Sequence, residues 1–311
     1  MRKLFVLFLV LGVASSAFSA SVVQDLVKTT AARAANAPNS QDWFLAANWG
    51  GNVNVGIPGI PQNDTATLCN GATLYGSAAT SYNSSGAVDA INIVGGNAAV
   101  GQLRVGSSNT TSAGIPAALA MYSGTLAIGD SFSSLHNSGF MSVGSDSATP
   151  SLTSGGRNGL FYMYDGAVTA LYGQGAITIG NGNSTFGTCF GKMYMTGGTV
   201  DALTFRIGRY TGVTGEVYLS GGTITTNVFE MGLGTKLLDI TGSGKLVLNG
   251  NQTALIDGYI DNGWIKSNGV AWDDYSHVYY DGSKTTLTLI PEPATICLLG
   301  IGALSLIRRR S

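Results

Sequence analysis

One phrase recurs along the middle of this 311-residue chain. It consists of a short apolar strand, a glycine turn, a connecting stretch, a second strand of the form apolar-x-apolar, and a closing glycine. The clearest copies are MYMTGGTVDALTFRIG, from Met193 to Gly208, and VYLSGGTITTNVFEMG, from Val217 to Gly232. Copies upstream are more widely spaced, and the shortened last copy is LDITGSGKLVL. One such unit cannot bury its apolar face alone, so the pattern favours stacked copies around a common core.

Aligned on the glycine turn, the first strands alternate apolar and polar residues with a period of two. The residues predicted to point inward are Ile91, Leu119, Phe161, Met193, Val217 and Leu238, with Ile93, Met121, Met163, Met195, Leu219 and Ile240. Between these columns lies an outward column that includes Tyr162, Tyr194 and Tyr218. In the second strands the residues predicted to point outward are Arg104, Ser142, Thr178, Arg206 and Glu230.

The sequence therefore predicts an all-β fold, a right-handed parallel β-helix (β-solenoid) of short Gly-rich repeats over residues 85–250. Met163, Met195 and Leu219 should stack inside it, and Arg206 should lie beside Glu230. A non-repetitive β-sandwich also has alternating strands separated by turns. It gives no reason for the same turn and the same columns to stay in register through six copies.

Both flanks of the repeats are predicted to be caps or targeting segments. Residues 1–20 have a basic start, an apolar stretch and a small-residue end, which is typical of a helical signal peptide. Residues 21–41 are predicted to be a linker, and residues 42–84 an N-terminal cap with the first coils. Trp43 and Trp49 lie there, and they are either a sugar-stacking pair or part of the cap over the first rung. This opening phrase resembles that of secreted, autotransporter-like β-helical repeat proteins of bacteria.

Residues 251–290 break the repeat pattern and are predicted to be the C-terminal cap. Val278–Tyr280 and Thr285–Leu289 are separated by a short polar segment that contains Asp281 and Gly282. Asp-Gly between two apolar runs is typical of a β-hairpin with a type I′ turn. We therefore expect a hairpin here, with Asp281 and Gly282 at the centre of its turn.

The last 21 residues combine three features in order. Pro291-Glu292-Pro293 precedes an apolar run from Ile296 to Ile307, and Arg308, Arg309 and Arg310 follow. This tail, residues 291–311, resembles the PEP-CTERM sorting signal. The resemblance implies an exported bacterial protein that is read, and cleaved, by an exosortase-type membrane protease, with exopolysaccharide and biofilm as associated context.

The physical character of the tail fits that resemblance. The apolar run is a marginal membrane span for a hydrophobic sorting helix, and the arginines should stop on the cytoplasmic side. Pro291, Glu292 and Pro293 are thus predicted as the sorting motif, and Arg308, Arg309 and Arg310 as the membrane stop. We expect a transient anchor in the inner membrane; a plain permanent anchor is the alternative.

Charge and cysteine content restrict the partners. Without Arg2, Lys3, Arg308–Arg310 and Glu292, the chain holds 11 basic and 16 acidic residues, a net charge of −5. An acidic exterior argues against nucleic-acid binding, which needs a basic patch. Cys69, Cys189 and Cys297 show no metal-ligand spacing, and the sequence does not decide whether Cys69 and Cys189 form a disulfide.

Catalytic chemistry has weak support in the sequence. Asp130, Asp146, Asp165 and Asp201 do not share one column of the repeat, and Asp165 occupies a turn position. The densest polar cluster, from Asp273 to His277, lies outside the repeats. We therefore predict no catalytic residues, no metal and no cofactor.

The expected function is that of a non-enzymatic structural or adhesive protein of the bacterial cell surface or extracellular matrix. The expected partners are an exosortase-type protease and, as a candidate, an exopolysaccharide. Two alternatives stay open. One is a carbohydrate-binding protein that contacts glycan through Tyr162, Tyr194 and Tyr218, and the other is a polysaccharide lyase or hydrolase. The sequence names no glycan and no oligomeric state.

Overall fold

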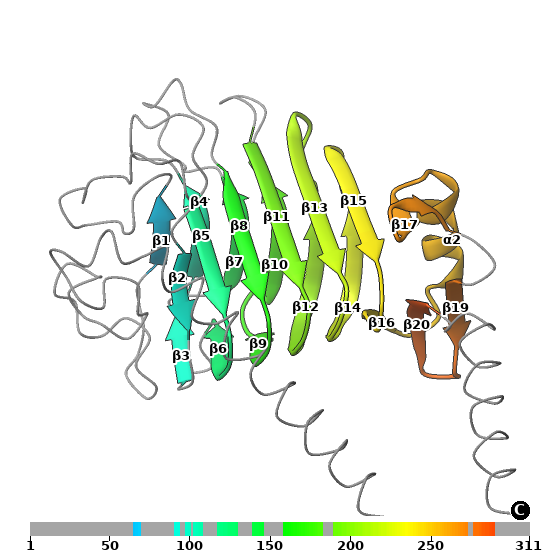
Figure 1. Cartoon of the computed structure of the whole chain (residues 1–311), viewed down its shortest axis with the longest axis horizontal. Coiled ribbons are helices and arrows are strands. Elements are labelled where there is room, and N and C mark those ends of the chain that lie inside the picture. The colour runs from blue at the N-terminus through cyan, green and yellow to red at the C-terminus, as the bar shows by residue number, and fades with distance from the viewer. Residues whose placement is uncertain are drawn as a thin grey trace, which may run out of the picture.

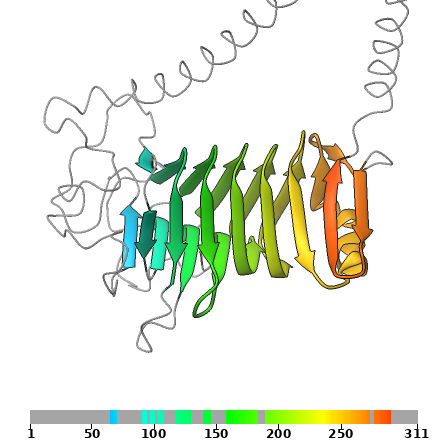
Figure 2. The ribbon, with the colours of Figure 1, turned by 90° about the horizontal axis from the view of Figure 1, so that it is seen from below.

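The fold is all-β, and the chain alternates between two sheets that pack against each other (Figures 1 and 2). This computed structural model describes residues 65–69, 90–93, 97–100, 102–107, 117–129, 139–145, 158–182, 189–272 and 276–289. The predicted signal peptide, the linker, Trp43, Trp49, and the sorting segment 291–311 lie outside these ranges. Strand and helix labels follow Figure 1.

Sheet A has eight strands, of which seven are parallel. They are β2 (Ala90–Ile93), β5 (Ala117–Met121), β8 (Gly159–Met163), β11 (Cys189–Met195), β13 (Val213–Leu219), β15 (Thr235–Ile240), β17 (Ile265–Ser267) and the antiparallel β18 (Val270–Ala271).

Sheet B has twelve strands. Its parallel strands are β1 (Thr65–Cys69), β3 (Asn97–Val100), β4 (Gln102–Ser107), β6 (Thr125–Ile128), β7 (Phe140–Ser145), β9 (Ala167–Ala170), β10 (Ala176–Asn181), β12 (Thr199–Ile207), β14 (Thr223–Met231) and β16 (Lys245–Asn249). The antiparallel pair β19 (Ser276–Tyr280) and β20 (Lys284–Leu289) completes it.

The predicted register is confirmed. Met195 is the register partner of Met163 on one side and of Leu219 on the other. The predicted inward residues from β4 to β15 whose burial is described are all buried, because they line one core between the sheets. Burying each large apolar side chain stabilises the fold by roughly 1.5–3 kcal/mol, so this shared core is the main support of the stacked strands.

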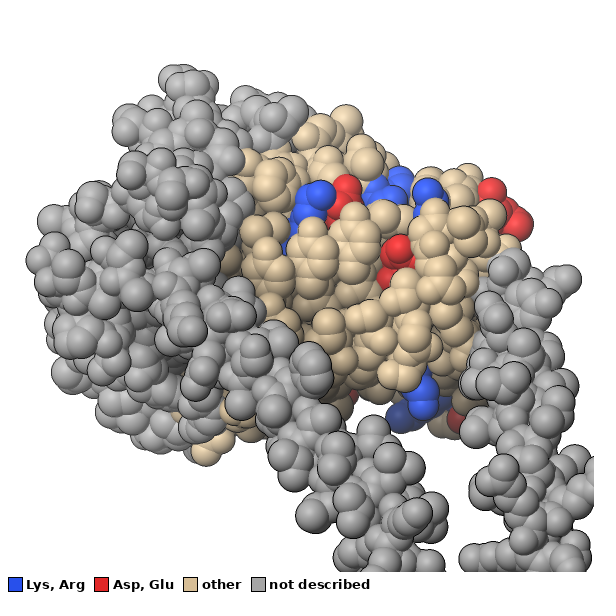
Figure 3. Space-filling model, in the orientation of Figure 1, with Lys and Arg blue, Asp and Glu red and all other residues tan. Residues whose placement is uncertain are grey.

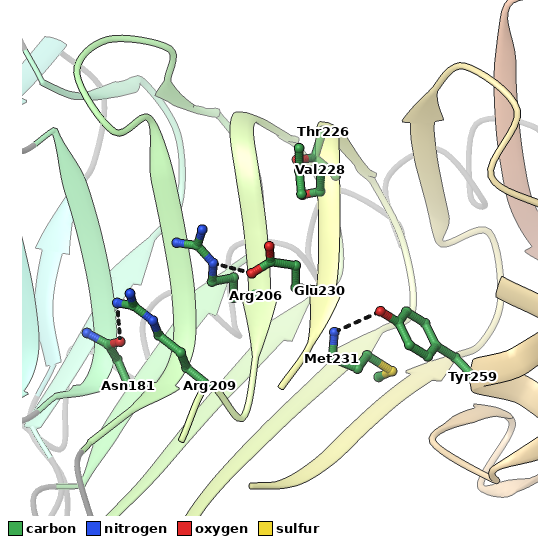
Figure 4. Close-up of polar contacts among 8 residues, drawn as sticks. All are labelled: Asn181, Arg206, Arg209, Thr226, Val228, Glu230, Met231 and Tyr259. Atoms are coloured by element: carbon green, nitrogen blue, oxygen red, sulfur yellow. Dashed lines mark hydrogen bonds and ion pairs between the residues drawn. The ribbon is translucent and has the colours of Figure 1, made fainter. Parts of the chain in front are cut away.

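The outward column of sheet B is confirmed only in part. Arg206 and Glu230 are register partners, and Arg206 Nε donates to Glu230 Oε2 in an ion pair on the outer surface (Figure 4). Ser142 and Thr178 are buried, although we predicted that both face solvent. Alternation along a strand predicts on which side of the sheet a side chain lies. It does not predict whether other parts of the chain cover that side and bury the side chain.

Close backbone contacts where sheet B leads into sheet A require glycine. Gly180 has a φ of +78°, a conformation that residues with a Cβ rarely adopt. Gly191, near the start of β11, lies directly against the backbone of Gly180 and Val143, so a Cβ at Gly191 would overlap both. Gly159, Gly191 and Gly215 are register partners on β8, β11 and β13. The lack of a side chain at these positions lets each strand come close to the backbone of sheet B at this corner.

The C-terminal end of the core is covered by helix α2 (Thr253–Asp261) and the two hairpins. Ile256 of α2 is buried in the core, and Tyr259 packs edge-on against Phe229 at 5.9 Å between ring centroids. Tyr259 Oη also accepts a hydrogen bond from Met231 N at 3.4 Å (Figure 4). Ile256 and Tyr259 thus close this end of the core.

The hairpin of β19 and β20 is confirmed, but the predicted turn is wrong. Asp281 N donates to Lys284 O at 3.1 Å, so the central residues are Gly282 and Ser283. Gly282 has a φ of +100°, and Ser283 has a negative φ, which fits a type II′ turn. Asp281 instead precedes the turn, where its Oδ1 accepts hydrogen bonds from Ser283 N and Lys284 N.

Candidate functional site

The outer face of sheet A carries a stack of tyrosines. Tyr162, Tyr194 and Tyr218 are register partners on β8, β11 and β13. The ring centroids of Tyr162 and Tyr194 lie 5.3 Å apart, and those of Tyr194 and Tyr218 lie 5.0 Å apart. The ring planes differ by only 12° and 7°. The stack forms because parallel in-register strands repeat the same residue at one strand spacing, about 4.8 Å.

Two further tyrosines extend this stack toward the N-terminus. Tyr164 follows β8 and stacks on Tyr122 at 4.8 Å and on Tyr162 at 6.5 Å. The sequence alignment missed both, because they lie in the turn and not in the column that holds Tyr162. The five residues, Tyr122, Tyr162, Tyr164, Tyr194 and Tyr218, are called the tyrosine ladder below.

A polar cluster adjoins the C-terminal end of the tyrosine ladder. Tyr218 Oη donates to Glu216 Oε2 at 2.8 Å, and Lys192 Nζ lies 2.7 Å from the same oxygen. Burial and the hydrogen bond to Glu216 raise the pKa of Tyr218 to about 12, and the hydrogen bond to Glu216 raises the pKa of Lys192. Burial, followed by the neighbouring Tyr164, raises the pKa of Tyr122 to about 12. These groups keep their neutral phenol and charged ammonium forms at neutral pH.

The stacking limits what the tyrosine ladder can bind. A sugar packs its C–H face against the face of an aromatic ring, but both faces of Tyr194 are covered by Tyr162 and Tyr218. Aromatic pairs of this kind stabilise a sheet by about 0.5–1.5 kcal/mol each beyond their buried area. The geometry therefore favours a structural role for these rings over the predicted glycan contact.

The acidic residues that the structure describes are dispersed. Asp165 Oδ1 accepts a hydrogen bond from Gly166 N at 2.7 Å, so it acts in the turn as expected. Asp201 lies in β12 between Thr169 and Thr225 on the neighbouring strands. Asp130, Asp146, Asp273 and Asp274 lie outside the described residues. Within the described ranges, no group of three or more His, Cys, Asp or Glu residues is placed to hold a metal ion.

Cys69 and Cys189 lie on different sheets. Cys69 ends β1 in sheet B, whereas Cys189 begins β11 in sheet A and is buried. The Cys189 thiol donates to the Gly144 carbonyl oxygen at 3.7 Å. The thiol is therefore engaged inside the fold near the close contact of Gly144 with β11.

Cations and aromatic rings meet where sheet B passes into sheet A. Arg209 follows β12, and its Nη1 donates to Asn181 Oδ1 at 3.3 Å (Figure 4). The guanidinium also lies 4.7 Å from the ring centroid of Tyr210. Lys236 of β15 lies 3.7 Å from the ring centroid of Trp264. In the space-filling view, Lys and Arg side chains are visible along this edge of sheet A (Figure 3).

The predicted sorting motif follows the folded body directly. β20 ends at Leu289, so only Ile290 separates the last strand from Pro291. The motif residues Pro291, Glu292 and Pro293 and the arginines Arg308–Arg310 lie outside the described residues. Among the helices of the described part, none is long and apolar enough to cross a membrane.

Comparison with known proteins identifies the tail. Neither the curated proteins nor the solved structures contain a significant match to the chain. A family model described as the PEP-CTERM protein-sorting motif matches residues 289–311, which include Pro291, Glu292, Pro293 and the three arginines. This motif indicates an exported bacterial protein that is sorted by an exosortase, a membrane protein. The chain therefore carries a PEP-CTERM sorting motif, which is joined to the end of β20.

Proposed function

We propose that the protein is a non-enzymatic structural or adhesive component of the bacterial cell surface or extracellular matrix. The observation that carries this proposal is the sorting motif placed directly after β20, which makes the stacked sheets the exported cargo. The body is proposed to be a right-handed parallel β-helix in which each copy of the repeat contributes one rung. Parallel register through β8, β11, β13 and β15 supports this arrangement.

A rigid body of stacked strands suits a structural role. Each rung is held to its neighbours by backbone hydrogen bonds, by the shared core and by the tyrosine ladder. Such arrays owe their stability to contacts between adjacent repeats. We propose that the tyrosine ladder reinforces the outer face of sheet A and is not itself the glycan contact.

A catalytic role is not part of the proposal. Lyases and hydrolases that act on polysaccharides need a carboxylate pair or a base beside a bound cation. Asp165 is used within its own turn, and Asp201 is flanked by Thr169 and Thr225. A test for reducing-sugar release from acidic polysaccharides would detect a lyase or hydrolase, and we expect none.

Export and sorting are tested by replacing Pro291, Glu292 and Pro293 with Ala together. The wild-type protein should reach the surface fraction, and the triple variant should accumulate in the inner-membrane fraction. Replacing Lys284 in the adjacent hairpin turn by Ala is the control, because this exposed residue lies outside the matched motif. Equal surface amounts of the triple variant and the wild type would refute sorting through this motif.

A further inference from the structure

The transition from sheet B to sheet A carries two cations, Arg209 and Lys236, that form no ion pair with a carboxylate of the described residues. The corner patch is defined by Arg209, Tyr210, Leu233, Lys236 and Trp264. The ion pairs among the described residues are Lys192 with Glu216 and Arg206 with Glu230, so neither Arg209 nor Lys236 has an acidic partner there. Their aromatic contacts hold the two cations in place and leave their charge uncompensated.

The corner patch is continuous across two adjacent rungs. Leu233 N donates to Arg209 O at 3.3 Å, and Lys236 Nζ donates to Gly232 O at 2.6 Å. The first hydrogen bond joins the turn after β14 to the turn after β12, and the second holds Lys236 against the turn after β14. Burial lowers the pKa of Lys236, and an anion bound here would stabilise the charged form of its ammonium.

Exposed apolar side chains lie among these cations. Leu233 is 76% exposed and Tyr210 is 38% exposed. A ligand that fits the corner patch therefore carries negative charges and apolar surfaces close together. Acidic polysaccharides have both, since carboxylates alternate with the C–H faces of the sugar rings.

The position of the corner patch separates this ligand from the lipid surface. Leu289, two residues before Pro291, pairs with Ser276, and the preceding residue, Thr288, pairs with Lys245 beside the start of β14. Leu233 lies beyond the other end of β14, a strand of nine residues. At about 3.3 Å for each residue, β14 separates the two sites by at most roughly 30 Å. The corner patch thus lies at the opposite end of β14 from the place where the chain leads into the sorting motif.

We propose that the corner patch binds an acidic, uronate-bearing polysaccharide outside the cell, with Arg209 and Lys236 as the charged contacts. This inference rests on the proposed extracellular function, and it adds the ligand class and the contact residues. Two cations give modest affinity that decreases as salt increases, because exposed charges are screened.

Binding is tested with the mature protein as it is purified from the surface fraction. Polygalacturonate is the probe, neutral dextran is the uncharged control, and affinity electrophoresis or calorimetry measures the dissociation constant. Arg209→Gln and Lys236→Gln should each weaken binding about tenfold, which corresponds to about 1.4 kcal/mol, because each removes one charged contact. Lys245→Gln makes the same change in net charge at the opposite edge of sheet B and should bind like the wild type.

Several results would overturn the proposal. They are equal binding of dextran and polygalacturonate, an equal loss in Lys245→Gln, tighter binding to duplex DNA, or tighter binding to vesicles of phosphatidylcholine and phosphatidylglycerol. Circular dichroism establishes that each variant is folded. The mass and surface location of the same preparations report on export, so a sorted protein that fails to bind polygalacturonate refutes the ligand assignment alone.

Discussion

The phenol of Tyr218 donates a hydrogen bond to the carboxylate of Glu216, two residues earlier on the same strand, over 2.8 Å. Lys192 on the neighbouring strand contacts the same carboxylate oxygen at 2.7 Å. One acidic side chain thus links two neighbouring strands, β11 and β13, and orients the last ring of the tyrosine ladder. The outer face of sheet A is in this way organised by side chains as well as by backbone pairing.

The tyrosine ladder should contribute to stability through its ring faces. Tyr194→Ala removes both of its stacking contacts and should lower the free energy of unfolding by about 1–3 kcal/mol. Tyr194→Phe keeps the ring and should cost less than about 1 kcal/mol. Urea denaturation measures both. If the Phe variant lost as much stability as the Ala variant, the hydroxyl group and not the stacking would be the important feature.

The inward and outward faces should respond differently to a carboxylate. Met195 is fully buried, so Met195→Asp places an unpaired charge in the core and should cost several kcal/mol or prevent folding. Thr223 lies on the outer face of sheet B beside Lys245, and Thr223→Asp should change stability by about 0.5 kcal/mol or less. Thermal unfolding of the two variants provides the comparison, and similar losses would contradict the assignment of faces.

The close approach at the corner of the sheets predicts a steric effect. Gly191→Ala would drive a Cβ into the backbone of Val143 and Gly180, so it should destabilise the protein by more than about 1 kcal/mol. Gly258→Ala is the matched control, because no atom lies within 4 Å of its added Cβ. It replaces a glycine inside α2 and should stabilise the protein by up to about 1 kcal/mol. Opposite signs in urea denaturation are the expected result.

Alkaline pH should weaken the fold through the tyrosine ladder. Burial raises the pKa of Tyr122 and Tyr218 to about 12 from an ordinary value of 10.0. Because the folded state holds these protons more tightly, their stabilising effect is complete below pH 10 and is lost as the pH rises toward about 12. Phenolate absorbance during a pH titration should show a late-titrating group of tyrosines, which Tyr218→Phe reduces. Titration of all tyrosines near pH 10 in folded protein would contradict the burial.

The sequence predicted the column structure well, because period-two alternation and a recurring turn fix which residues meet across parallel strands. Met163, Met195 and Leu219 stack as predicted, and Arg206 meets Glu230. Register follows from these patterns, since a slip of one residue would place every inward side chain outside.

Other features depend on contacts that no single strand encodes. Ser142 and Thr178 are buried on the side predicted to face solvent. The glycines at 159, 191 and 215 precede each inward pair at a constant spacing, a signal that alignment on the turn overlooked. The turn of the hairpin lies one residue later than predicted. The side chain of Asp281 accepts a hydrogen bond from the turn backbone, and Gly282 is the turn residue that has a positive φ. The sequence did not predict the corner patch, because the turns that carry Arg209 and Lys236 come together only when the strands stack.

The most direct test of the account is the intact mass of the protein recovered from the surface or matrix fraction. The sorting motif joined to β20 predicts a mature species that ends near Pro291-Glu292-Pro293 and lacks the apolar run from Ile296 to Ile307 and the arginines after it. A surface species whose mass still includes Ile296 to Ser311 would contradict processing at this motif and would leave a permanent C-terminal anchor as the explanation of the tail.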